Sequence, residues 1–181
     1  MKNVTLFFIL LCVSTSASIA QRVTDGLVDL FSFSEQHGSF IHDVSGSGFP
    51  TLLTIHDTTA VNWLPEGGLQ VNEPVLIHSS LPAQDFIANT LVSEAFSLEA
   101  WVVPANTTQN GPARILSISE GTSSRNAMLA QDEDRYVARL RTTTTDNNGM
   151  PNIEAPAASV NTELQHVVFT RDAEGNTTFY V

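Results

Sequence analysis

Lysine and cysteine are almost absent from this sequence of 181 residues. The only cysteine, Cys12, and the only lysine, Lys2, both lie in the first twenty residues. From Gln21 onward the chain therefore has neither a disulfide nor a thiol nucleophile, and burial of apolar side chains must hold it together. Its length and its 42% hydrophobic content are sufficient for one domain with a real core.

Positive charge is scarce as well. Residues 21–181 carry seven arginines and nineteen acidic residues, which gives a net charge of −12. This balance argues against a nucleic-acid partner, because proteins bind nucleic acids by neutralising phosphates with Lys and Arg. An acidic surface instead suits solubility, association with cations and neutral ligands such as glycans.

The sequence also lacks a hydrophobic run long enough to cross a membrane. The apolar stretch at residues 4–13 is shorter than the roughly 20 residues that a bilayer requires. Lys2 gives a positive start, and Ser18 and Ala20 offer a cleavage site, so residues 1–20 are predicted to be a secretory signal peptide. We therefore expect a secreted protein, extracellular, periplasmic or at the cell surface, with no membrane span in the mature chain.

Helical periodicity is scarce, and short alternating runs of apolar and polar residues recur instead. They are separated by Gly, Pro, Asn, Asp and Ser, which are typical of turns. Many short strands with such spacers predict an all-β fold, an antiparallel two-sheet sandwich. The predicted strands are residues 26–33, 73–80, 96–103, 113–119, 135–142, 164–171 and 177–181.

The run FSLEAWVV at residues 96–103 shows the alternation most clearly. One of its faces is wholly apolar, with Leu98 and Ala100 among its residues, and is expected to face the core. The other face is mixed and carries Trp101. Pro104 then ends the strand, because proline has no backbone N–H for the ladder.

One segment has helical spacing. In residues 82–92 the side chains of Phe86, Ile87 and Leu91 recur at the spacing of a helix behind Pro82, a residue that a first helical turn tolerates. We predict one short surface helix there.

The alternation continues to the last residue without a turn signal. Thr177, Phe179 and Val181 fall on one side of this final run. A strand broken off in this way leaves unpaired edge groups. We therefore expect residues 21–181 to be one domain that lacks its last strands, within a larger multidomain protein.

Four motifs follow one another in the order FSLEAWV, PARILSIS, LQHVVFTRD and TTFYV. Together with the N-terminal stretch GLVDLFSFSEQHGSFIHDVSGSG, they resemble the laminin G-like domains of the concanavalin A-like lectin/glucanase superfamily. The resemblance covers most of residues 26–181, although the Asp-Gly that follows YV in that family is missing. It implies a curved two-sheet jelly roll and an extracellular module that binds glycans or proteins.

Known catalytic patterns are missing. The same superfamily contains glycosidases, whose retaining members need two carboxylates about 5 to 5.5 Å apart, but the family's Glu-x-Asp-x-Glu pattern does not occur. The nearest acidic run, Asp132 to Asp134, is expected to be a solvated turn. Gly-x-Ser-x-Gly and His-Glu-x-x-His motifs are absent too. We expect no enzyme activity in this chain.

Two aspartates are candidate ligands for calcium. Asp43 lies in HDVSGSG, and Asp146 begins the DNNG of a predicted long hairpin loop. Ca²⁺ prefers the carboxylate and carbonyl oxygens that such loops offer; the alternative is that both aspartates only form turns. The histidines show no metal-ligand spacing; they are His37, His42, His56, His78 and His166.

Arginines and one tryptophan are the candidate ligand-binding residues. Arg139 and Arg141 point from the same face of their predicted strand, and Arg114 opens a run that could lie nearby. With Trp101 they could grip a sugar acid or a partner's carboxylate through forked hydrogen bonds and stacking. The alternative is a solvated ladder in which Glu99 pairs with these arginines.

The expected function is non-catalytic binding of a glycan or an extracellular protein. Two alternatives stay open. The chain could be an accessory domain of a glycoside hydrolase or lyase whose catalytic part lies elsewhere, or a structural or adhesive surface module.

Overall fold

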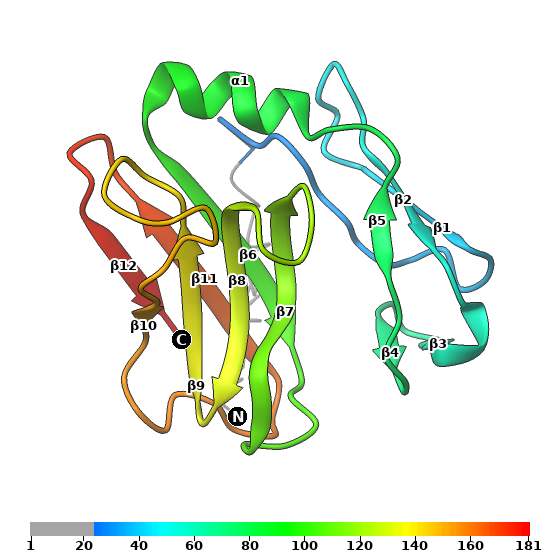
Figure 1. Ribbon diagram of the computed structural model, residues 1–181. Coiled ribbons are helices and arrows are strands. Elements are labelled where there is room, and N and C mark those ends of the chain that lie inside the picture. The colour runs from blue at the N-terminus through cyan, green and yellow to red at the C-terminus, as the bar shows by residue number, and fades with distance from the viewer. Residues whose placement is uncertain (1–23) are drawn as a thin grey trace, which may run out of the picture.

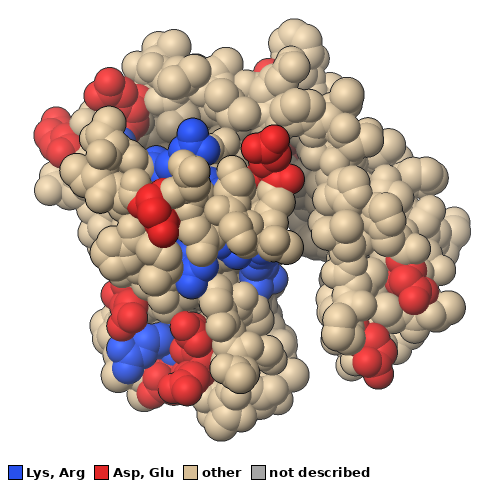
Figure 2. Space-filling view, viewed as in Figure 1, with Lys and Arg blue, Asp and Glu red and all other residues tan. Residues whose placement is uncertain are grey.

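The computed structural model describes residues 24–181, which form two parts linked by a helix (Figure 1). We call strands β1–β5 the N-terminal part and strands β6–β12 the sandwich. A deep cleft separates the two parts below the helix (Figure 2). The predicted signal peptide at residues 1–20 lies outside the described residues. Within residues 24–181, no helix has the length and apolar character needed to cross a bilayer.

The N-terminal part consists of short strands around a small core. β1, β2 and β5 form one antiparallel sheet, and β3 pairs with β4. Ile41, Ile55 and Val61 are buried together between them. The elements are β1 (Phe40–His42), β2 (Leu52–Ile55), the 3₁₀ turn η1 (Thr58–Ala60), β3 (Val61–Trp63), β4 (Leu69–Val71) and β5 (Ile77–Ser79).

The prediction of a strand at residues 26–33 is wrong. Only an isolated bridge between Phe31 and Asp43 forms in this stretch. Phe33 has a φ angle of 51°, and a residue in the left-handed region cannot continue an extended strand. The segment therefore runs past the N-terminal part as irregular chain.

The sandwich stacks two antiparallel sheets. One has the strand order β10-β9-β8-β7 and the other the order β12-β11-β6, and Figure 1 shows the first in front of the second. This agrees with the predicted all-β fold of concanavalin A type. The strands are β6 (Phe96–Val102), β7 (Gln109–Ser119), β8 (Arg125–Glu133), β9 (Arg135–Leu140), β10 (Ile153–Glu154), β11 (Gln165–Arg171) and β12 (Thr177–Tyr180).

One apolar layer fills the space between the sheets. Leu98, Val167 and Phe169 come from the β12-β11-β6 sheet, and Leu129 and Ala138 come from the other. All five are at most 3% exposed. Fully burying a side chain of the size of Leu or Phe stabilises the fold by about 1.5–3 kcal/mol, so this layer is the main source of the sandwich's stability.

A buried polar contact also connects the two sheets. The hydroxyl of Tyr136 on β9 donates to Oε1 of Gln165 on β11 at 2.8 Å. Burial raises the pKa of Tyr136 to about 12, so the hydroxyl keeps its proton. Gln165 in turn donates to the Ser159 carbonyl and accepts from the backbone N–H of Asn161, both at 2.9 Å. Both ends of the glutamine amide are therefore satisfied, and the loop before β11 is held in place.

The central strand β8 is buried on both of its faces. Leu129 faces the apolar layer, whereas Met128 and Ala130 pack with Val137 of β9 on the outer face of the sheet, the face turned away from the other sheet. A strand that is apolar on both sides shows no alternation. This is why its sequence, RNAMLAQDE, was not predicted as a strand.

The predicted helix is confirmed as α1 (Gln84–Ser93). Phe86 attaches it to the sandwich, with its ring at 5.5 Å from that of Phe96 in an edge-on arrangement. The helix ends at Ser93 and is capped by Glu94, which has left-handed backbone geometry and donates its N–H to the Thr90 carbonyl.

Removing the hydroxyl that links the sheets tests the importance of this contact. Tyr136→Phe should lower the free energy of unfolding by about 1 kcal/mol, because Oε1 of Gln165 loses one of its buried donors. Urea unfolding followed by fluorescence measures the change. Tyr180→Phe is the matched control, since Tyr180 is 58% exposed. Equal unfolding midpoints for the two variants would contradict a stabilising role of the contact.

Candidate functional site

Arginines gather on the outer face of the sheet formed by β7 to β10. Arg114 of β7 pairs with Ala130, and Arg139 of β9 pairs with Met128. Residues paired across antiparallel strands point to the same face, and Ala130 and Met128 belong to the outer-face cluster. Arg114 and Arg139 therefore project from the same side of the sandwich.

A bulge in β8 adds a third arginine to this face. Ile118 of β7 pairs with Ala127, but the next residue, Ser119, pairs with Arg125. Asn126 is thus an extra residue that has no partner on β7. An extra residue of this kind shifts the alternation by one position, so Arg125 points outward while Ala127 points into the apolar layer.

Arg125 is a buried cation that has no counter-ion within residues 24–181. It is only 5% exposed, and its Nε and Nη1 atoms have no hydrogen-bond partner among the described residues. Burial lowers the pKa of Arg125 below its usual value, and the positive charges of Arg114 and Arg139 lower it further. The guanidinium group of Arg125 is therefore close enough to those of Arg114 and Arg139 to be repelled by both. We call Arg114, Arg125 and Arg139 the arginine cluster.

Among the described residues, the side chains of Arg114 and Arg139 form hydrogen bonds with neutral groups only. Arg114 donates through Nη2 to the Thr122 carbonyl at 3.2 Å, and Arg139 donates through Nε to Oδ1 of Asn152 at 2.7 Å. Arg135, on the same strand as Arg139, instead bonds to a carboxylate oxygen of Glu154 at 2.8 Å. Among residues 24–181, no member of the cluster forms an ion pair.

Arg141, another predicted ligand-binding residue, lies beside the bulge. It follows the end of β9, is exposed, and donates its backbone N–H to the carbonyl of Asn126 at 2.9 Å. The structure therefore places Arg114 and Arg139 in one sheet and Arg141 directly after strand β9 of that sheet, and ligand binding by these residues stays a prediction.

The loop between β9 and β10 packs against the arginine cluster. The backbone N–H of Arg125 donates to the Asn147 carbonyl at 2.9 Å. Gly149 has a φ angle of 73°, and a Cβ atom there would come within 2.8 Å of the Leu140 nitrogen, so only glycine fits. Next to it, Oδ1 of Asn148 is buried and has no partner among the described residues. The loop therefore places the buried, unused acceptor of Asn148 next in sequence to Asn147, whose carbonyl binds the N–H of Arg125.

The two calcium candidates lie in different parts of the molecule. Asp146 shapes the loop just described, because its Oδ1 accepts from the N–H groups of Asn148 and Met150, both at 2.8 Å. Asp43 is next to the N-terminal sheet. The structure does not bring the two carboxylates together, and no group of three or more His, Cys, Asp or Glu residues suited to a metal occurs in residues 24–181. A calcium site stays a prediction.

The carboxylate of Asp43 is used by its own turn. It accepts hydrogen bonds from the backbone N–H groups of Leu30 at 2.9 Å and Ser45 at 2.8 Å, and from the Ser45 hydroxyl at 3.0 Å. Although burial acts to raise it, the pKa of Asp43 lies below its usual value because these donors stabilise the charged form. This matches the alternative interpretation of Asp43 as a turn former.

Trp101 lies on the opposite outer face of the sandwich, away from the arginine cluster. It belongs to β6, points away from the apolar layer and is 59% exposed. Its ring stacks on His166 of β11, with centroids 4.3 Å apart. His166 also contacts Oε1 of Glu99 at 3.0 Å. The predicted joint site of Trp101 with the arginines is therefore not formed, and the alternative ladder between Glu99 and the arginines is wrong as well.

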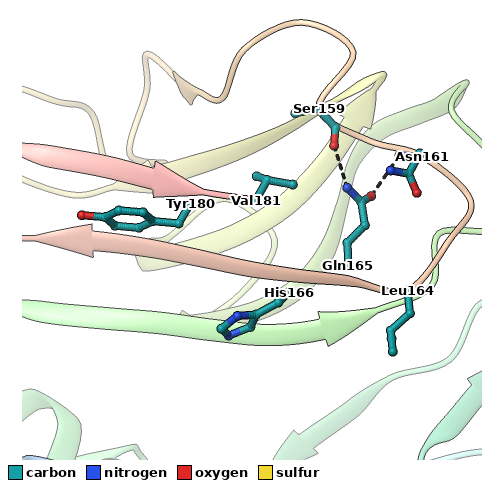
Figure 3. Close-up of a pocket in the computed structure, with 7 residues that line it drawn as sticks. All are labelled: Ser159, Asn161, Leu164, Gln165, His166, Tyr180 and Val181. Carbon is teal, nitrogen blue, oxygen red and sulfur yellow. Dashed lines mark hydrogen bonds between the residues drawn. The ribbon is translucent and has the colours of Figure 1, made fainter.

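An open hollow of about 620 Å³ adjoins the Trp101 face. Figure 3 shows that Tyr180 and His166 project from neighbouring strands there, while the amide of Gln165 holds the rim at Ser159 and Asn161. The hollow is lined by Ser159, Asn161, Leu164, Gln165, His166, Tyr180 and Val181.

Arg125 is the functional candidate that the sequence did not reveal. Counted by strict alternation, it falls on the same side as Ala127 and Leu129, which are core residues. Only the bulge at Asn126 turns it outward, and nothing in the residues around that position marks a bulge. An arginine two positions before the apolar run AMLA was the one available hint.

A comparison with protein-family models gives one match. Residues 78–181 match a laminin G model described as the concanavalin A-like lectin/glucanases superfamily. The matched segment extends from β5 through α1 to the end of the sandwich and includes the arginine cluster and Trp101. Comparisons with curated proteins and with solved structures give no match.

The lack of a counter-ion for Arg125 predicts an unusual effect of its removal on stability. Arg125→Met should raise the free energy of unfolding by about 1 kcal/mol, because an apolar side chain of similar length replaces a buried, unpaired charge. Thermal and urea unfolding measure this change. Arg135→Met is the control and should not stabilise, since Arg135 is ion-paired. A clear loss of stability in Arg125→Met would show that the guanidinium has a partner after all.

Proposed function

The chain belongs to the concanavalin A-like lectin/glucanase superfamily, and from this premise we propose an exported, non-catalytic binding module whose ligand places an anionic group on the arginine cluster. The observation that carries the proposal is the buried guanidinium of Arg125, which has unused donors at Nε and Nη1. A buried donor without a partner costs free energy. A bound anion would remove this cost and would also relieve the repulsion among the three arginines.

The chemistry of the arginine cluster favours a planar or tetrahedral oxyanion. Guanidinium groups match carboxylate and sulfate-like oxygens through paired, charge-assisted hydrogen bonds. Because the family's description names lectins and glucanases, both of which recognise glycans, we assign the anion to an acidic glycan, such as one with uronic acid units. A carboxylate on an extracellular protein is the alternative partner.

The surroundings of the arginine cluster support binding rather than catalysis. A glycosidase needs two carboxylates on either side of the scissile bond. Glu154 pairs with Val137 of β9 on the outer face, and its carboxylate forms an ion pair with Arg135. Arg135 also lies 3.5 Å from a carboxylate oxygen of Asp134. The arginine cluster on this outer face can bind a charged ligand, but arginine side chains do not provide the general acid that a glycosidase requires.

Export is proposed from the signal-peptide pattern in residues 1–20. Laminin G-like domains are typically extracellular, which is consistent with this location. A glycan or a protein at a cell surface would then be within reach of the arginine cluster.

Trp101 offers a second surface on which a neutral sugar could bind. Its exposed indole ring, stacked on His166, is of the kind that sugar rings pack against. This surface lies on the other side of the sandwich, so the two surfaces can be tested independently.

Binding to a glycan array tests the proposal. Wild-type protein should bind acidic glycans, and Arg139→Ala should weaken binding about tenfold or more, because a hydrogen bond to a charged group contributes about 1.5–3 kcal/mol. Arg135→Ala is the matched control on the same strand and should bind normally. Equal signals for wild type and Arg139→Ala would remove the arginine cluster from the site. Loss of binding in Trp101→Ala alone would move the site to the opposite face.

A further inference from the structure

Two histidines meet on the surface of the N-terminal part. The Nε2 atoms of His56 and His78 are 2.7 Å apart, and the rings stack with centroids separated by 4.7 Å. His78 belongs to β5 and pairs with Thr54, and His56 follows the end of β2. Both side chains are exposed, so the pair is open to solutes.

The hydrogen bonds around His78 fix the protonation of its ring. Its Nδ1 lies 2.5 Å from the carbonyl oxygen of Ser79. Because a carbonyl oxygen only accepts, Nδ1 of His78 must carry the proton, and the Nε2 of the neutral ring then has a free lone pair directed at His56. Histidines that bind metals are held in this way, with one ring nitrogen donating to a carbonyl and the other facing the metal.

The position of His56 is fixed as well. Its backbone N–H donates to the carbonyl of Leu76 at 3.0 Å, immediately before β5. The backbones that carry the two rings are thus joined by strand pairing, so little conformational freedom is lost when both rings bind one ion.

We propose that His56 and His78 form a binding site for a divalent transition-metal ion such as Zn²⁺ or Ni²⁺. Two imidazole nitrogens at about 2.0–2.1 Å from one ion lie roughly 3 Å apart, so the observed separation has to widen slightly and the two rings have to turn until both Nε2 lone pairs point at the ion. On binding, the proton that His56 shares with His78 leaves Nε2 of His56, and the neutral His56 ring then carries its proton on Nδ1, so that both Nε2 lone pairs are available to the ion. Imidazole nitrogen selects such metals over Ca²⁺ and Mg²⁺, which prefer oxygen.

The site is a two-residue site completed by water. No group of three or more His, Cys, Asp or Glu residues suited to a metal occurs among the described residues, and the exposed side of the pair leaves room for solvent ligands. An ion there would connect the end of β2 to β5 and so brace the β1-β2-β5 sheet. Because the pair exists only in the folded chain, the ion should stabilise the fold.

Calorimetric titration of the full chain with ZnCl₂ and NiSO₄ tests the proposal. The protein must carry no polyhistidine tag and must first be treated with a chelator. Wild type should bind one ion per chain and show a higher melting temperature with Zn²⁺. His56→Gln and His78→Gln should each weaken binding about tenfold or more, since loss of even an outer-shell partner weakens metal binding 10- to 100-fold.

His42→Gln and His166→Gln serve as matched controls. Each of these histidines contacts a carboxylate, Glu35 or Glu99, and neither belongs to the pair. Both variants should bind Zn²⁺ like the wild type. Urea unfolding without metal checks that the variants are folded, and His56→Gln leaves the contact between His78 and Ser79 intact if His78→Gln is unstable.

The spectrum of bound Cu²⁺ provides an independent readout. Nitrogen couplings in its electron paramagnetic resonance should indicate two imidazole ligands in wild type and one in either pair variant. Equal Zn²⁺ affinity in wild type and both pair variants, or no binding by wild type, would overturn the proposal and leave His56 and His78 as a hydrogen-bonded pair.

Discussion

The apolar layer between the two sheets is the constraint on which the other features depend. Side chains in a strand alternate, so burying Leu98 and Phe169 against Leu129 also decides which residues face outward. Trp101 is thereby assigned to one outer face of the sandwich and Arg139 to the other. A charged surface and an aromatic surface can thus exist on a small domain without competing for the same ligand.

The sequence predicts most clearly those strands of the sandwich that are buried on one side only, and it also predicts β9, in which Tyr136, Val137 and Ala138 are all buried. Strands β6, β11 and β12 alternate clearly, and their motifs, together with that of β7, carry the family resemblance that the match over residues 78–181 confirms. Strand β8 was missed because both of its faces are apolar. The stretch 26–33 has the alternation of a strand, but the left-handed backbone at Phe33 and the lack of a partner along most of its length keep it irregular.

The candidate sites were predicted less completely, because they depend on details of register and on pairing between distant segments. Alternation predicted that Arg139 and Arg141 share one strand face, but β9 ends at Leu140, and alternation could not reveal the bulge that turns Arg125 outward. His56 and His78 are 22 residues apart in sequence and meet only through the pairing of β2 with β5. Spacing rules for metal ligands describe neighbours along one segment, so they do not detect a pair across two strands.

The arginine cluster is set in a chain with a formal net charge of −11. Beyond the Debye length of about 8 Å at physiological ionic strength, an approaching anion is screened from individual arginines. At low ionic strength it encounters mainly the negative field of the whole molecule. This field slows the approach of densely charged polyanions, whereas a glycan ligand with isolated acid groups meets a smaller electrostatic barrier. Added salt should therefore have opposite effects on the two stages of binding. It should speed the diffusional encounter of the anionic ligand with the protein, and it should weaken the final contact between the ligand and the arginine cluster.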